Sequence, residues 1–118
     1  VVTNRQALQY CLGETAVPLL QETVLASLSG AVMEPRAKGT RALEVVGHAE
    51  DREEPGTALA RAEAVREWMV GPGGVDPARL RVSAAPAGGR GDRRVELALL
   101  DGSGADLAEV RRKADGML

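Results

Sequence analysis

The sequence predicts a mixed α/β (α+β) domain, a two-layer sandwich in which helices cover one face of a mixed β-sheet. Short apolar runs typical of strands alternate with longer stretches whose apolar residues recur at helical spacing, in the order β-α-β-α-β-β. The length of 118 residues suits one domain. We therefore expect a single domain over 1–118, with a core over 1–100 and a linker and short C-terminal helix over 101–118.

The first half of the chain supplies two predicted strands and one helix. Residues 7–12 form an apolar run that ends at a glycine, and residues 42–46 form a second β-type run. Between them, Pro18 suits the first turn of a helix and Gly30 marks its exit. The helical spacing is carried by Val17, Leu20, Val24, Leu25 and Leu28.

The second half supplies a helix, two strands and a terminal helix. Thr57 is a suitable N-cap, and Gly71 with the glycines that follow would end the helix. Strands are predicted over 80–84 and 94–100. The apolar stripe of the helix consists of Ala58, Ala62, Val65 and Met69. Leu107, Val110, Ala114 and Met117 predict the short terminal helix.

The predicted core is aliphatic, because the chain has one Tyr, one Trp and no Phe. The lone Cys11 has no partner for an intramolecular disulfide and is expected to be a small buried side chain. The residues expected in the core are Leu20, Val24, Leu28, Val45, Val65, Leu80, Val82, Val95 and Leu97.

Composition argues against several classes of function. A net charge of −2 and scarce aromatics disfavour binding to nucleic acid or to an anionic membrane. No apolar run reaches the roughly 18 residues of a membrane span. A single His without a cysteine cluster gives no metal-ligand set, and no serine, cysteine or carboxylate pair has a recognisable catalytic setting. We expect a binding module without cofactor or metal rather than an enzyme.

Four short blocks, in order, resemble the OmpA-like domain, the module that anchors bacterial envelope proteins to peptidoglycan. That family has a strand ending in Gly-His-Thr-Asp, a helix with Arg-Ala-x-x-Val, a Gly-Val-x-x-x-Arg-Leu turn and Asn-Arg-Arg-Val-Glu before its last strand. The matching blocks here are Gly47-His48-Ala49-Glu50, Arg61-Ala62 with Val65, Gly74-Val75 with Arg79-Leu80, and Asp92-Arg93-Arg94-Val95-Glu96. The resemblance implies the family's fold and a place in the cell envelope, periplasmic or extracytoplasmic.

The resemblance also implies a set of ligand-binding residues. In the family, the Asp binds the ammonium group of diaminopimelate in the peptidoglycan stem peptide, and the Arg binds a carboxylate of the same residue. Arg61 matches the Arg, and Glu50 stands in the place of the Asp. Asp51, one position later, is the alternative acid, and His48 belongs to the same block. For His48, a structural hydrogen bond is the alternative.

This chain departs from the family between its acid and its arginine. Glu50 and Arg61 are 11 positions apart, several fewer than in the family, and the family's Asn is among the missing residues. The run 50–54 is then most simply a solvated acidic loop. For Arg61, a surface residue paired with a nearby acid is the alternative to ligand binding. Arg93 and Arg94 are expected to make structural contacts around the last strand. Two functions stay open: peptidoglycan binding through the stem peptide, or a divergent scaffold that contacts proteins of an envelope or secretion assembly.

Overall fold

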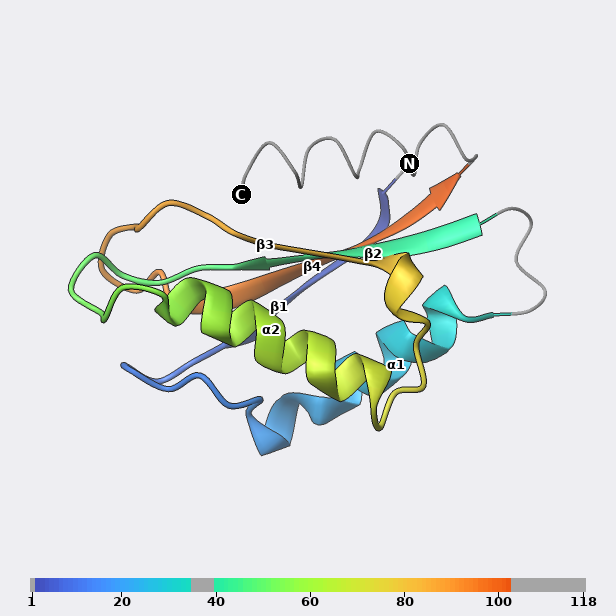
Figure 1. Ribbon diagram of the computed structural model, residues 1–118, viewed down its shortest axis with the longest axis horizontal. Coiled ribbons are helices and arrows are strands. Elements are labelled where there is room, and N and C mark those ends of the chain that lie inside the picture. The colour runs from blue at the N-terminus through green and yellow to red at the C-terminus, as the bar shows by residue number, and fades with distance from the viewer. Residues whose placement is uncertain (1, 35–39, 103–118) are drawn as a thin grey trace.

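The computed structural model describes residues 2–34 and 40–102, which form the elements shown in Figure 1. The described strands are β1 (Val2–Gln9), β2 (Thr40–Gly47), β3 (Leu80–Ala84) and β4 (Arg94–Gly102). The α-helices are α1 (Glu22–Val32) and α2 (Thr57–Val70), and the short 3-10 turns are η1 (Leu19–Gln21) and η2 (Pro77–Arg79). The helix predicted over 107–117 lies outside the described residues.

The four strands form one mixed sheet in the order β1-β4-β2-β3. β4 is antiparallel to both of its neighbours, β1 and β2, whereas β2 and β3 run parallel. The parallel pair is joined by a crossover through α2, as parallel strands require. Both helices lie on the same face of the sheet (Figure 1), so the predicted fold class is confirmed.

The core lies between this face and the two helices. Alternate residues of β4, Val95, Leu97 and Leu99, face the helices, as the period of two in a strand requires. α1 and α2 contribute Leu25, Leu28, Val32, Ala62, Val65 and Met69 to the same cluster. Six of the predicted core residues are buried: Leu28, Val45, Val65, Leu80, Val95 and Leu97. Val24 and Val82 are partly buried against the cluster.

The prediction for Leu20 is wrong, since 96% of its surface is exposed. The predicted helix begins later than its apolar spacing suggests, at Glu22, and continues past Gly30 to Val32. Leu20 instead lies in η1, which the side-chain amide of Gln21 fixes beside β1. That amide accepts from the backbone N–H of Gln9 and donates to its carbonyl, both at 2.8 Å.

The first strand is also placed earlier than predicted, at Val2–Gln9 rather than 7–12. β1 is an edge strand with mostly exposed side chains, so it lacks the apolar run that the prediction relied on. Cys11 consequently follows the strand and is exposed, which corrects the expectation of a buried thiol.

The start of α2 differs from the prediction by one residue. The N-cap is Gly56, with φ 87°, and Thr57, the predicted N-cap, is the first helical residue.

Gly47 allows α2 to pack directly on the end of β2. A Cβ at this position would lie 1.8 Å from the carbonyl oxygen of Ala58 and 3.2 Å from Cβ of Ala62. Only glycine fits this approach. The contact brings the first turns of α2 next to the residues that follow β2, where the candidate site lies.

Candidate functional site

Arg61 is the centre of the candidate site and is completely buried, with a relative exposure of 0%. It belongs to α2 and extends beneath the β2–α2 loop. Its guanidinium makes a two-pronged ion pair with Glu53: Nη1 donates to Oε1 at 2.8 Å, and Nη2 donates to Oε2 at 2.5 Å. This planar, two-bond geometry is the strongest form of arginine–carboxylate pairing.

The remaining N–H groups of Arg61 bind backbone carbonyls from two other segments. Nε donates to the oxygen of Glu14 at 2.8 Å, Nη1 to that of His48 at 3.0 Å and Nη2 to that of Cys11 at 3.3 Å. The ring of Tyr10 lies 5.0 Å from the guanidinium carbon, at cation–π distance. Each donor of the guanidinium therefore already has an acceptor from the chain itself.

The carboxylate of Glu53 is as fully engaged as its arginine. Oε1 also accepts from the backbone N–H of Glu50 at 2.9 Å, and Oε2 from that of Gly13 at 2.8 Å. Its side chain is only 1% exposed. The hydrogen bonds from Arg61 chiefly lower the pKa of Glu53, against its burial, to about 2. Glu53 is thus held as a buried anion. The expectation of a solvated acidic loop over 50–54 is therefore wrong for Glu53, whereas Asp51 and Glu54 are exposed.

Glu50 is likewise buried, with its side chain 0% exposed, and its charge is neutralised within the chain. Its carboxylate accepts from Nε of Arg52 at 2.7 Å, from Nη1 of Arg93 at 3.2 Å, and from the backbone N–H of Gly91. The Gly91 N–H, followed by the Arg52 side chain, lowers the pKa of Glu50. Glu50 is therefore ionised and bound by residues of its own chain.

His48 contributes its backbone to Arg61, while its ring lies among different residues. Nδ1 is 3.9 Å from the carboxylate of Asp92, and Nε2 is 3.6 Å from that of Glu96. Burial, and then the charge of Arg94, lowers the pKa of His48. The expected structural hydrogen bond of the ring is not found, because Nε2 is buried without a hydrogen-bond partner among the described residues. The hydrogen bonds of His48 are made by its backbone, whose N–H donates to the carbonyl of Arg94 and whose carbonyl accepts from Arg61.

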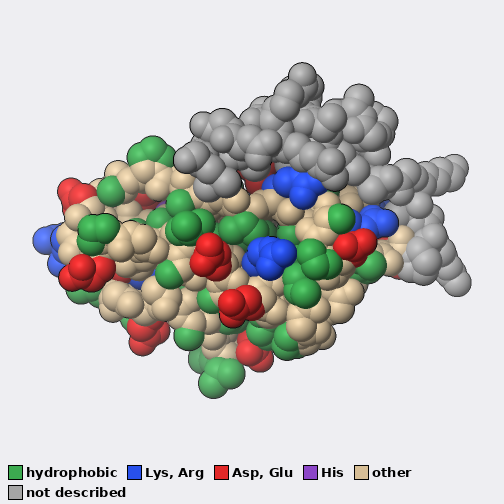
Figure 2. Space-filling model, viewed as in Figure 1, with side chains coloured by type: hydrophobic (Ala, Val, Ile, Leu, Met, Phe, Trp, Pro, Cys, Tyr) green, Lys and Arg blue, Asp and Glu red, His purple; other side chains and the backbone are tan. Residues whose placement is uncertain are grey.

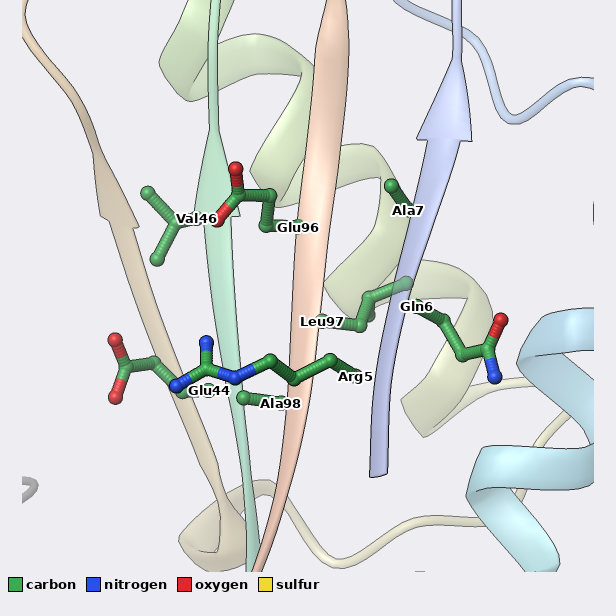
Figure 3. A pocket seen from close by; sticks show the side chains of 8 residues that line it. All are labelled: Arg5, Gln6, Ala7, Glu44, Val46, Glu96, Leu97 and Ala98. Carbon is green, nitrogen blue, oxygen red and sulfur yellow. The ribbon is translucent and has the colours of Figure 1, made fainter. Parts of the chain in front are cut away.

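Glu96 lines a shallow groove of about 400 Å³ on the face of the sheet opposite the helices. Figure 3 shows Arg5 extending across Ala98 toward Glu44, in the order in which these residues pair across β1, β4 and β2. The residues lining this groove are Arg5, Gln6, Ala7, Glu44, Val46, Glu96, Leu97 and Ala98. The ring of His48 therefore lies close to this groove through Glu96. Only the backbone carbonyl of His48 contacts the Arg61 guanidinium.

Asp51 is the exposed member of the predicted set. Its backbone N–H donates to the carbonyl of Gly88 at 2.9 Å, which ties the loop to the segment before β4. Arg93 donates through Nε to the carbonyl of Tyr10 at 3.0 Å, and Arg94 pairs with Asp92 and Glu96. The structural role predicted for both arginines is confirmed.

The sequence prediction missed Glu53 and Tyr10. Glu53 lies eight positions before Arg61, and Tyr10 directly follows β1. No periodicity links such residues, so the only available signal was the presence of acids in the run 50–54. The structure joins Glu53 to both the guanidinium of Arg61 and the backbone of Glu50, so Glu53 links these two predicted site residues.

Other kinds of site are not evident in the part of the chain that the structure describes. Within residues 2–34 and 40–102, no group of three or more His, Cys, Asp or Glu side chains could hold a metal ion. No helix among these residues is long and apolar enough to cross a membrane. Figure 2 shows acidic, basic and hydrophobic side chains interspersed on the visible face rather than one large basic patch.

Comparison with known proteins gives matches among solved structures. No protein-family model and no curated protein sequence matches the chain. The peptidoglycan-associated lipoprotein of Burkholderia pseudomallei matches with a TM-score of 0.67 and 17% identity, covering 80% of this chain and 89% of that one. The C-terminal domain of Helicobacter pylori MotB matches with a TM-score of 0.65 and 16% identity, covering 94% and 95%.

A third solved structure, the cell wall anchor of the T6SS from Pseudomonas aeruginosa, has a TM-score of 0.60 and 20% identity, covering 86% and 87%. These neighbours are OmpA-like domains. The chain has the OmpA-like fold, and the resemblance drawn from the four sequence blocks is confirmed at the level of fold. At these identities the side chains of the site have to be judged by their own geometry.

Proposed function

We propose that this domain is a non-catalytic binding module of the bacterial cell envelope that associates with peptidoglycan. The observation that carries the proposal is the OmpA-like fold, which the chain shares with a peptidoglycan-associated lipoprotein and with a cell wall anchor. The module would then lie on the periplasmic or extracytoplasmic side of the envelope. Its partners would be peptidoglycan and proteins of an envelope or secretion assembly.

The finer form of the proposal is recognition of the stem peptide at the β2–α2 loop. A zwitterionic diamino acid needs an acid for its ammonium group and an arginine for its carboxylate. Asp51 is the exposed acid of the loop, whereas Glu50 is held by Arg52 and Arg93. Arg61 is the family's arginine, but it already holds the carboxylate of Glu53. A stem-peptide carboxylate would therefore bind Arg61 only by replacing Glu53.

The pair between Arg61 and Glu53 favours a second candidate, a scaffold that no longer binds the stem peptide and contacts other proteins. An incoming carboxylate would make the same two hydrogen bonds that Glu53 already makes. It would also lose translational and rotational freedom, which costs about 4 kcal/mol or more. Exchange at Arg61 by itself then gives no net gain, and binding would need further contacts elsewhere on the ligand.

Co-sedimentation with purified peptidoglycan tests the proposal and separates its two forms. We expect the native domain to sediment with peptidoglycan. If the stem peptide is recognised, sacculi that contain diaminopimelate should retain more protein than sacculi that contain lysine. Asp51→Asn should reduce this retention, while Glu54→Gln, which changes an exposed acid nearby, should not. Absence of the native domain from the pellet of both kinds of sacculi would refute peptidoglycan association and favour the scaffold.

A further inference from the structure

We infer that Glu53 is the resident ligand of Arg61 and is the residue that prevents the native domain from accepting an external carboxylate there. The inference deepens the proposed function, on which its biological meaning rests, by naming the residue that sets the specificity of the site. It assigns a latent carboxylate-binding site to a position that the chain's own side chain fills. The argument uses the contacts of Glu53 and the nature of the groups that surround it.

The surroundings of Glu53 form a complete carboxylate-binding site. Its two oxygens accept four hydrogen bonds, two from the guanidinium of Arg61 and one each from the backbone N–H groups of Glu50 and Gly13. These donors come from α2, from the β2–α2 loop and from the loop that follows β1. Several segments thus converge on one anion, an arrangement typical of a built anion site.

The guanidinium of Arg61 keeps its position through contacts that do not involve Glu53. Arg61 is also fixed by the carbonyls of Cys11, Glu14 and His48 and by the ring of Tyr10. Removal of the Glu53 carboxylate would therefore leave an oriented guanidinium with unpaired N–H groups. Such groups in a buried site strongly favour an anion that can accept from them.

The covalent tether explains why Glu53 excludes an external carboxylate. Glu53 and a free carboxylate offer the same oxygens to the same donors, so the bonds formed in an exchange equal those that are broken. The tethered group is already at the site, however, and acts at a high effective concentration. A free carboxylate can bind only when the side chain is shortened or when other contacts draw the loop away.

Substitution of Glu53 by Ala tests the inference through chemical rescue. The change removes the terminal methylene and the carboxylate, which together have nearly the size and charge of acetate. We expect acetate to bind the Glu53→Ala domain beside Arg61 and to raise its Tm by roughly 4 °C or more at about tenfold its Kd. The native domain and the Glu54→Ala domain, which has lost an exposed neighbouring acid, should show no such shift.

The titration uses sodium acetate against sodium chloride at equal ionic strength. Glu53→Gln is the matched variant with a filled site, and acetate should leave its Tm unchanged. If Glu53→Ala is unfolded without acetate, the same titration is followed by near-UV circular dichroism, and recovery with acetate but not chloride supports the inference. An acetate response of Glu53→Ala no larger than that of the native domain, or no recovery of an unfolded variant, would overturn it.

The outcome is separable from that of the peptidoglycan proposal. Acetate rescue together with failure of both the native domain and Glu53→Ala to sediment with peptidoglycan would leave the inference standing and remove the proposed function. Sedimentation of the native domain without acetate rescue of Glu53→Ala would leave the proposed function standing and overturn the inference. If both the inference and the proposed function hold, sacculi that contain diaminopimelate should retain more of the Glu53→Ala domain than of the native domain.

Discussion

Replacement of Arg61 by Met should destabilise the domain more than any change of a half-buried arginine on the same helix. Met retains much of the aliphatic volume of the side chain but removes the guanidinium, so Glu53 would stay buried without its partner. The substitution also takes the donor from three backbone carbonyls, those of Cys11, Glu14 and His48. Cys11 and Glu14 lie between β1 and α1, and His48 directly follows β2. The effect of the substitution would therefore extend beyond the β2–α2 loop.

The expected loss follows from the burial of the pair. Both side chains are at most 1% exposed, so solvent does not screen their interaction. Removal of one partner from a buried ion pair costs about 3–5 kcal/mol. Each carbonyl left without a donor adds about 1–3 kcal/mol, although such terms are not additive. We expect a loss of about 4 kcal/mol or more, a large part of the roughly 5–15 kcal/mol that stabilises a domain.

Urea unfolding followed by the fluorescence of Trp68 would measure this loss. Trp68 is the only tryptophan of the chain, and its indole N–H donates to Glu22 at 3.2 Å, which links α2 to α1. Arg66→Met, the same chemical change at a half-buried position of α2, should cost no more than about 0.5 kcal/mol. Equal losses for Arg61→Met and Arg66→Met would refute the assignment of Arg61 as the buried anchor of the site.

Three further measurements test the fold and the site. The pKa of Glu53 is about 2 in the folded domain against an ordinary 4.5, so its stabilisation is complete above pH 4.5 and is lost as the pH falls toward 2; the difference in urea midpoint between the native domain and Glu53→Gln should shrink over that range, and a constant difference would contradict the assignment. Leu28→Ala should cost about 2–5 kcal/mol, whereas Leu20→Ala, at a side chain that is 96% exposed, should leave the unfolding free energy within about 0.5 kcal/mol of native; a comparable loss for both would mean that Leu20 is packed. Gly47→Ala should cost about 3 kcal/mol or more, because the new Cβ would lie 1.8 Å from the carbonyl of Ala58; an unchanged Tm would show that α2 does not approach β2 so closely.

Much of the fold could be predicted because it depends on local patterns. The alternation of Val95 and Leu97 determines which face of β4 is buried, and the helical spacing of Ala62, Val65 and Met69 determines the buried stripe of α2. Gly71 ends that helix at the predicted position. These features depend on the backbone period and on the burial of apolar surface, both of which are written in neighbouring residues.

The site depended on contacts that only the folded chain creates. The sequence by itself determined that Arg61 lies on α2 behind a β-strand that ends in Gly47, and that acids occupy the intervening loop. It did not determine that Glu53, rather than Glu50 or Asp51, would meet the guanidinium. That choice was made by the tertiary structure, because the backbone N–H of Gly13, 40 positions away, completes the shell around Glu53. A buried charge is stable only where such distant donors converge, and no local pattern records that convergence.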